Sequence, residues 1–287
     1  MKNRLTIAIQ KKGRLSEESI DLIKKSGINF TYNGDKLLAK SSNLPIDILF
    51  VRSDDIPSLI SNGDADLAIV GENVLIEKTL FKRTYIEKVL DLGFSKCRLS
   101  FAIPQNSKIK NFKNKKIATS YPNTVRKYLK DNKINASVTN IHGSVELTPY
   151  IGMSDVICDL VSSGATLEAN NLKEIEVILQ SQAVLIKNKN LQVKKLAIAT
   201  KVINRMEGVI NANESKYVML NSDASKAKEI CKLLPGSESP TIIPLEDKNK
   251  VAIHALCQEP IFWETMEKLK DKGASSILIM PVEKILN

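Results

Sequence analysis

The segment that decides the fold reads Asp155-Val156-Ile157-Cys158-Asp159-Leu160-Val161-Ser162-Ser163-Gly164-Ala165-Thr166. Its apolar first half is typical of a buried strand, and its small, polar second half is typical of a turn that opens a helix. Asp155 and Asp159 are four residues apart, so a strand directs both to the same face. A carboxylate beside a loop of hydroxyls and backbone amides is suited to a phosphorylated sugar, because the acid accepts from ribose hydroxyls and the loop donates to phosphate.

The same order of strand, turn and helix recurs along the first 180 residues. The expected strands cover residues 5–9, 46–51, 66–70, 116–119, 136–141 and 155–160. They form two successive β-α-β-α-β units, which predict two doubly wound lobes of parallel sheet. Ligands of such sheets bind beyond the carboxyl ends of the strands. We therefore expect a cleft at six turns, residues 10–15, 52–55, 71–73, 119–123, 143–146 and 162–167.

Local signals add detail to this pattern. Ser16 and Ser53 are expected to cap helices, since their hydroxyls can accept from the first free N–H groups. The Asn33-Gly34 pair within residues 30–39 predicts a hairpin.

The last third of the chain has a different order of elements. Residues 196–210 have helical spacing, and a β-α-β-β-α-β series follows at residues 217–220, 225–233, 241–243, 251–256, 262–270 and 276–280. This order is ferredoxin-like and predicts a separate small domain. Trp263, Met266 and Leu269 are interpreted as the core-facing stripe of its second helix.

The charge is strongly basic, with 42 lysine and arginine residues against 32 acidic ones and a net charge of +10. The lysines are scattered and do not alternate with aromatic residues, so we do not expect a nucleic-acid partner. Arginine is scarce, and Arg14, Arg52 and Arg98 each fall at the end of an apolar, strand-like run. Because a guanidinium binds phosphate through two parallel hydrogen bonds, these three are candidate phosphate ligands.

Cysteine and histidine content argues against several kinds of chemistry. The four cysteines form no C-x-x-C pair, which disfavours zinc ribbons and thioredoxin-like redox sites. Two histidines are too few for a multi-histidine metal site and disfavour a serine–histidine–acid triad. No apolar run approaches the ~20 residues of a membrane helix, and the N-terminal apolar run is too short for a secretory signal. We therefore expect a cytoplasmic protein with no membrane partner.

Ordered motifs along nearly the whole chain resemble those of the ATP phosphoribosyltransferase family in its long form. The longest motif spans residues 158–170, with the sequence CDLVSSGATLEAN. The others lie at residues 10–16, 45–49, 51–57, 71–75, 97–100, 117–122, 143–146, 214–217, 239–241, 262–269 and 273–278. Each motif alone is weak evidence, whereas the ordered set is specific.

The resemblance implies an α/β fold with two lobes of the periplasmic-binding-protein type II kind and a C-terminal regulatory domain. The implied boundaries are 1–95 with 180–208 for lobe I, 96–179 for lobe II and 212–287 for the histidine-binding domain. The implied enzyme is a glycosyltransferase of the first step of histidine biosynthesis. It moves the 5-phosphoribosyl group of phosphoribosyl pyrophosphate (PRPP) to N1 of ATP with Mg²⁺ and releases pyrophosphate. The implied partners are ATP, PRPP, histidine as feedback inhibitor, and further copies of the chain in a dimer or hexamer.

The resemblance also implies roles for individual residues. The basic groups expected to stabilise charge, with no acid–base residue assigned, are Lys11, Arg14 and Arg52. The expected PRPP ligands, all in lobe II, are Asp155, Asp159, Ser162, Ser163, Gly164, Ala165, Thr166 and Leu167. The residues expected near ATP are Gln10, Gly13, Glu72, Asn73, Cys97, Arg98 and Leu99. The expected histidine ligands are Ser237, Ser239, Thr241 and Ala274, whereas metal ligands are not assigned. Some relatives carry an acid at the position of Asn221, so the strength of inhibition stays open.

Three other functions compete with this assignment. A non-enzymatic, two-lobed small-molecule sensor would share the fold but leaves the loop at residues 159–166 unexplained. Porphobilinogen-deaminase-like chemistry would require a cysteine that holds a pyrrole cofactor. A nucleic-acid binder would associate in a way that weakens steeply with salt.

Overall fold

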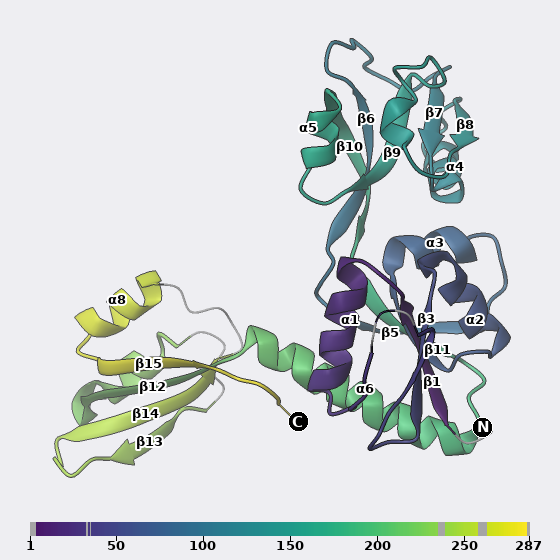
Figure 1. The fold of residues 1–287 in the computed structure, drawn as a ribbon. Helices are drawn as coiled ribbons and strands as arrows, with labels where there is room; N and C mark the ends of the chain where they lie inside the picture. Colours follow the sequence, from purple (N-terminus) through teal and green to yellow (C-terminus); the bar gives the residue numbers. More distant parts are fainter. Residues whose placement is uncertain (1–3, 33, 35, 235–238, 258–262, 286–287) are drawn as a thin grey trace. The chain divides into compact units, whose positions relative to one another are not determined.

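The computed structural model describes residues 4–32, 34, 36–234, 239–257 and 263–285 (Figure 1). Contacts divide the chain into two compact units, residues 1–200 and 201–287. The first unit holds two mixed α/β lobes, and the second is built on a four-stranded sheet. No helix in the described part of the chain is long and apolar enough to cross a bilayer.

Lobe I is built on a six-stranded sheet of order β2-β3-β1-β4-β11-β5. Its strands are β1 (Leu5–Gln10), β2 (Leu38–Lys40), β3 (Ile46–Val51), β4 (Leu67–Gly71), β5 (Ile86–Asp91) and β11 (Ala183–Asn188). The helices α1 (Arg14–Lys25), α2 (Ile56–Asn62) and α3 (Glu72–Thr79) follow β1, β3 and β4 along the chain. β4 is buried along almost its whole length and β1 along most of it, which explains their mainly apolar sequences.

Lobe II is built on a five-stranded sheet of order β10-β6-β9-β7-β8. Its strands are β6 (Cys97–Pro104), β7 (Lys116–Thr119), β8 (Ser137–Asn140), β9 (Val156–Val161) and β10 (Leu172–Ser181). The helix α4 (Pro122–Asp131) follows β7, and the short helix α5 (Ala165–Ala169) follows β9. Side chains from β6, β7 and β9, including Phe101, Ile117 and Val156, form the core under α4.

Both sheets are mixed, which corrects the prediction of fully parallel lobes. β11 is antiparallel to β4 and β5, and β6 is antiparallel to β9 and β10. The chain passes from lobe I to lobe II between β5 and β6 and returns between β10 and β11. β5 and β10 are largely exposed, so they lack the continuous apolar run that predicts a buried strand.

An aspartate precedes a central strand in each lobe and makes the same contact. The Asp66 carboxylate accepts a hydrogen bond from the backbone N–H of Thr6 at 2.8 Å, and the Asp155 carboxylate accepts one from Lys116 at 2.9 Å. Each bond joins the amino ends of two adjacent parallel strands, β1 with β4 and β7 with β9. Both aspartates therefore hold neighbouring strands in register.

The second unit is a ferredoxin-like domain, as predicted. The helix α6 (Val193–Glu214) begins before the division between the units and leads into β12 (Lys216–Asp223). The elements that follow are α7 (Ala227–Cys231), β13 (Thr241–Pro244), β14 (Lys250–Cys257), α8 (Trp263–Asp271) and β15 (Ser275–Pro281). The sheet order is β13-β14-β12-β15 with every neighbouring pair antiparallel, so the two helical connections cross over as this fold requires.

The prediction that Trp263 belongs to the core stripe of α8 is wrong. Its side chain is 75% exposed, whereas Leu269 is fully buried. Trp263 is the first residue of α8, one and a half turns before the part of the helix that reaches the core.

Three details near the N-terminus also differ from prediction. The helix α1 begins at Arg14 after Gly13, so Ser16 lies inside the helix and does not cap it. Gly13 has φ +92°, a left-handed value that favours glycine at this turn. Ser53 opens a 3-10 turn whose cap is Arg52. The short strand β2 pairs with β3, and residues 30–32 form no strand, so the described part of the predicted hairpin is absent.

Candidate active site

All six predicted turns lie where a strand ends and a helix or 3-10 turn begins. The pairs are β1–α1, β3–η1 (Ser53–Asp55), β4–α3, β7–α4, β8–η2 (Val145–Leu147) and β9–α5. The first turn of a helix has unpaired N–H groups and a partial positive charge. Both lobes therefore offer positions that suit an anion.

The turn between β9 and α5 forms a small hollow in lobe II of about 160 Å³. Gly164 has φ +91° and lies at the N-terminal cap of α5, and a β-carbon added there would meet nothing within 4 Å. Ser162, Ser163 and Thr166 are exposed along the turn, whereas the Leu167 side chain is buried. The loop is therefore open to a ligand and depends on glycine for its conformation.

Two acidic side chains line the same hollow. Asp159, near the end of β9, is half-buried, and burial raises the pKa of its carboxyl group. The hydrogen bond that Asp159 Oδ1 accepts from the N–H of Leu160 at 2.8 Å lowers that pKa in part, and the charge of Glu146 raises it. Asp159 and Glu146 therefore make one side of the hollow acidic.

The structure does not bring Asp155 to this hollow. Asp155 precedes β9 and binds the start of β7, whereas residues 162–167 follow the end of β9. Four residues of strand separate Asp155 from Asp159 by roughly 13 Å along the chain. Sharing a face of the strand was therefore insufficient evidence for a shared site.

Arg98 and Leu99 also lie differently from the expectation for ATP ligands. Arg98 is the second residue of β6, so it begins a strand and does not end one. Its guanidinium forms a two-point ion pair with Glu174 and donates to the carbonyl oxygen of Ser162 at 3.1 Å. This carboxylate–guanidinium pair lowers the pKa of Glu174. The Leu99 side chain is fully buried in the core, so it is not available to a nucleotide.

A larger hollow, of about 660 Å³, lies at the ends of β1 and β3 in lobe I. Its lining residues are Gln10, Lys11, Lys12, Leu37, Phe50, Val51, Arg52, Ser53 and Asp55. The first loop is held in place because the Lys11 N–H donates to the carbonyl of Val51 at 2.9 Å and the Tyr32 hydroxyl donates to the carbonyl of Lys11 at 3.1 Å. Lys11 and Arg52 are therefore brought together at one hollow.

Arg14 does not line that hollow in the structure. Its side chain is 74% exposed, and Nε lies 3.4 Å from a carboxylate oxygen of Glu18. The first helical turn of α1 places it on the exposed side, one turn before Glu18.

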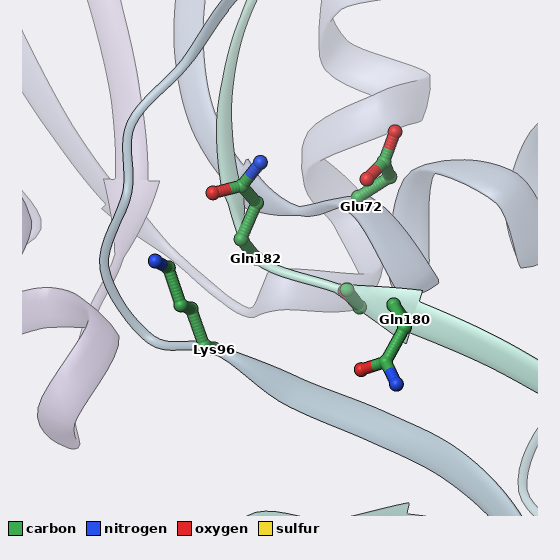
Figure 2. A pocket seen from close by; sticks show the side chains of 5 residues that line it. Glu72, Lys96, Gln180 and Gln182 are labelled. Atoms are coloured by element: carbon green, nitrogen blue, oxygen red, sulfur yellow. The ribbon is translucent and has the colours of Figure 1, made fainter. Parts of the chain in front are cut away.

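A third hollow, of about 330 Å³, lies where the chain crosses between the lobes (Figure 2). Glu72, Lys96, Gln180, Ser181 and Gln182 line it, and in Figure 2 the side chains of Glu72, Lys96 and Gln182 extend to one side. Only Glu72 was among the predicted site residues. The signal for Gln180, Ser181 and Gln182 was this polar step between two extended, more apolar strands, whereas no such signal marks Lys96.

Glu77 joins the two lobes and was not predicted from the sequence. This α3 carboxylate is buried and accepts from the N–H groups of Asn123 and Thr124 at 2.9 Å and 2.8 Å, and from the Thr124 hydroxyl at 2.7 Å. It thus occupies the N-terminus of α4 with a negative charge from lobe I. No sequence signal marks it, because an acid in a helix is ordinarily exposed.

Asn73 strengthens the same contact between the lobes. Its Nδ2 donates to the Tyr121 hydroxyl at 2.9 Å, and its Oδ1 accepts from the Ser181 hydroxyl at 2.9 Å. Burial raises the pKa of Tyr121 well above its ordinary range, so the phenol stays protonated. Because its amide is used within the protein, Asn73 positions the crossover strands and does not point at a nucleotide.

Among the predicted histidine ligands that the structure describes, Thr241 and Ala274 do not lie together within this chain. Ser237 lies outside the described residues. Thr241 begins β13, and Ala274 immediately precedes β15, which is at the opposite edge of the sheet. Asn221 of β12, which pairs with Ser275 next to Ala274, has a buried side-chain oxygen with no hydrogen-bond partner among the described residues.

No group of three or more histidine, cysteine or acidic side chains that could hold a metal ion occurs among the described residues. Mg²⁺ ordinarily keeps several waters and is held by one or two carboxylates together with substrate phosphates. The donor set of Asp159 and Glu146 beside an anion-compatible loop fits this pattern.

Comparison with known proteins identifies the family. A family model described as ATP phosphoribosyltransferase matches residues 52–208, and one described as the C-terminal domain of HisG matches residues 212–284. The chain is similar to the ATP phosphoribosyl transferase (HisG:HisZ) complex from Thermotoga maritima, with 29% identity and a TM-score of 0.63 over 72% of this chain and 98% of that chain. It matches the periplasmic VFT2 domain of Bordetella pertussis BvgS at 13% identity and a TM-score of 0.47, over 70% of this chain and 87% of that chain. With both family models matched in order, the chain belongs to the ATP phosphoribosyltransferase family of pentosyltransferases, in its long form.

Proposed function

We propose that this chain transfers the 5-phosphoribosyl group of PRPP to N1 of the adenine of ATP and releases pyrophosphate. The observation that carries this proposal is the open loop at residues 162–167, which follows Asp159 at the end of β9. The family match supports the substrate class, and the basic hollow of lobe I supplies a second place for phosphates. Two polyanionic substrates require two such places.

In this proposal lobe II binds the PRPP tail. The backbone N–H groups and hydroxyls of Ser162, Ser163, Gly164, Ala165, Thr166 and Leu167 donate to the 5-phosphate, and Asp159 accepts from the ribose hydroxyls. Asp155 is left out of the ligand set because it holds the start of the sheet. Small residues suit this role, since they let the backbone approach a phosphate closely.

The reaction requires alignment and charge stabilisation and needs no general base. The bond from ribose C1 to the pyrophosphate oxygen breaks and pyrophosphate keeps the electron pair, while the adenine N1 lone pair forms the new bond to C1. Lys11 and Arg52 of the lobe I hollow stabilise the charge on pyrophosphate or the ATP phosphates. The Arg14 guanidinium contacts this charge only if its ion pair with Glu18 is broken.

The nucleotide is proposed to lie between the lobe I hollow and the hollow at the crossover. Gln10 borders the first and Gly13 follows Lys12 of that hollow in the chain, whereas Glu72 borders the second and Cys97 follows Lys96. Gln180 and Gln182 add amide groups there that can both donate to and accept from an adenine edge. Mg²⁺, which neutralises phosphate charge when bound, is assigned to Asp159, Glu146 and the substrate oxygens.

The ferredoxin-like domain is proposed to bind histidine as a feedback inhibitor. The unpartnered Asn221 oxygen suits a donor such as the amino group of an amino acid. Thr241 lies in β13 and Ala274 immediately precedes β15, so the two are at opposite edges of a four-stranded sheet. Roughly 14 Å separates these two edge strands. One histidine can therefore contact both residues only if they come from two copies of the chain. This arrangement fits a dimer or hexamer, which we expect to act in the cytoplasm.

Asn221→Asp tests the regulatory site. A charged acceptor bonds an amine about twice as strongly as a neutral one, so we expect histidine to inhibit several-fold more tightly. Asn221→Ala should weaken inhibition by a similar factor, with the uninhibited rate unchanged in both variants. Inhibition constants that do not respond to either change would place the effector elsewhere.

The experiment that tests the proposed function is an assay of the full chain with ATP, PRPP and Mg²⁺. We expect pyrophosphate and N1-(5-phospho-β-ribosyl)-ATP to form in equal amounts, with no product when either substrate is omitted. Folded protein that forms neither product under these conditions would contradict the proposal. A two-lobed sensor would instead bind ligand without turnover.

A further inference from the structure

Glu174 was not among the predicted site residues, yet it is the centre of a bonded network in lobe II. Both of its carboxylate oxygens accept from Arg98, with Nε to Oε1 at 2.6 Å and Nη2 to Oε2 at 2.6 Å. Oε1 also accepts from the Ser100 hydroxyl at 2.7 Å. A two-point pair of this kind fixes the plane of the guanidinium as well as its position.

The register of the sheet brings these side chains to one face. Arg98, Ser100 and Ala102 are every second residue of β6 and therefore share a face, and Glu174 of β10 lies opposite Ala102. A β-bulge between Glu174 and Glu176 interrupts the ladder at this point. Bulges commonly redirect a side chain, so Glu174 reaches along β6 toward the carboxyl end of β9.

The third contact of Arg98 reaches the loop. Its Nη1 donates to the carbonyl oxygen of Ser162 at 3.1 Å. In a planar trans peptide the N–H of the next residue points opposite to the carbonyl, so this bond also fixes the direction of the Ser163 N–H. Arg98 therefore controls one of the backbone donors of the loop.

We infer that Glu174 is a positioning residue for PRPP, which holds Arg98 in the orientation that fixes the first peptide of the 162–167 loop. The inference rests on the proposed function in one respect, that this loop binds the 5-phosphate. Glu174 itself does not touch the substrate. Without its charge the guanidinium is free to turn, and the loop loses a fixed donor.

Glu174→Gln in the full chain tests this inference. We expect the dissociation constant of PRPP, measured by calorimetry without ATP, to rise about tenfold, as the loss of charge-assisted bonds to one group predicts. The KM for ATP and kcat should change by less than about twofold, since neither group acts on ATP. Arg98→Lys should weaken PRPP by a similar factor, and the double variant should be no worse than the single ones because both break the same connection.

Asp47→Asn is the matched control. Asp47 accepts from Arg4 Nε at 2.8 Å, and that guanidinium also donates to the carbonyl of Ile46 at 2.6 Å, but the group lies at the amino ends of β1 and β3. Asp47→Asn should lower the unfolding temperature about as much as Glu174→Gln and leave PRPP binding unchanged. Unchanged or tighter PRPP binding by Glu174→Gln, or an equal loss for ATP, would overturn the inference.

The outcomes separate this inference from the proposed function. If the wild type forms no product but binds PRPP more tightly than Glu174→Gln does, the proposed reaction is contradicted and the inference stands. A wild type that does not bind PRPP would contradict both. An active wild type with PRPP binding insensitive to Glu174 would contradict the inference alone.

Discussion

The two lobes offer anions different kinds of groups. The lobe I hollow carries the side-chain cations Lys11 and Arg52, which follow β1 and β3 and whose turns are joined by the hydrogen bond from the Lys11 N–H to Val51. The lobe II hollow has no basic side chain among its lining residues and offers a turn of small residues next to two carboxylates. Preorganised cations suit a leaving group whose charge grows during the reaction, whereas backbone donors suit a phosphate whose charge does not change. We therefore expect changes in lobe I to affect rate and changes in lobe II to affect PRPP affinity.

The largest effect is expected from Arg52→Gln. Removing one preorganised donor from a developing anion ordinarily lowers kcat by about 10²–10³-fold. The KM for PRPP should change little, because the 5-phosphate is bound in lobe II. Steady-state kinetics with both substrates varied measures this.

Arg83→Gln is the control for that change, because Arg83 is also exposed in lobe I but does not line the hollow. Its kcat should match the wild type. If Arg52→Gln raises only the KM for PRPP and leaves kcat unchanged, the proposed difference between the lobes is contradicted.

Gly164→Val is expected to have the next largest effect. The residue at φ +91° has open space around it, so the cost comes from the backbone and not from a clash. A left-handed conformation costs a branched residue about 1–2 kcal/mol or more, which corresponds to roughly a 5- to 30-fold rise in the KM for PRPP. Gly152→Val has a similar φ of +73° and open space in the same lobe, and it should lose stability without losing PRPP affinity. Equal losses in both variants would show that the loop has no special role.

Glu77→Gln tests whether the two hollows depend on a fixed contact between the lobes. Loss of the charge at the start of α4 should lower the free energy of unfolding by about 2 kcal/mol, since bonds to a charged group are worth about 1.5–3 kcal/mol. The KM values of both substrates should rise together, by a smaller factor than in Gly164→Val. Denaturant unfolding measures the loss of stability, and steady-state kinetics measure the KM values. Thr124→Val removes only the bond from the Thr124 hydroxyl to Glu77, so it should cause a smaller loss of stability and a smaller rise in both KM values. A change in one substrate alone would contradict a role between the lobes.

The pH dependence of Asp159 should give the smallest and most specific effect. Burial raises its pKa, so the folded protein binds this proton more tightly than the unfolded chain does, and stability falls as pH rises through the interval up to the raised pKa. PRPP binding should change in the opposite direction, because the ionised carboxylate is the better acceptor and is lost as pH falls through that pKa. Asp159→Asn should remove both dependences, raise stability at neutral pH and weaken PRPP. Parallel pH profiles of wild type and Asp159→Asn would contradict the assignment.

The comparison of Asp66 with Asp155 explains where sequence reasoning succeeded and failed. The strand–turn–helix pattern placed all six turns correctly, because buried parallel strands and small-residue turns leave local signals. Asp155 was grouped with Asp159 because both face the same side of the strand, although its contact with the start of β7 matches that of Asp66 with β1. The 162–167 loop follows the end of β9, so only Asp159, near that end, lies close to it. The two-residue periodicity of a strand shows which residues share a face but not which end of the strand they are near.

Glu77 and Glu174 were missed for a related reason. Each is an ordinary acid in its own segment and acquires its role through a distant partner. Asn123 is 46 positions from Glu77, and Arg98 is 76 positions from Glu174. Long-range pairs of this kind leave no pattern in a single sequence. The predicted ligand residues of the 162–167 loop, by contrast, are contiguous and could be recognised together.

Backbone hydrogen exchange in residues 162–167, with and without PRPP, tests the central claim most directly. If the loop holds the 5-phosphate through its N–H groups, the exchange of these amides slows on addition of PRPP, and Gly164→Val abolishes most of that protection. Exchange in the loop that stays unchanged while PRPP saturates the protein would contradict the account.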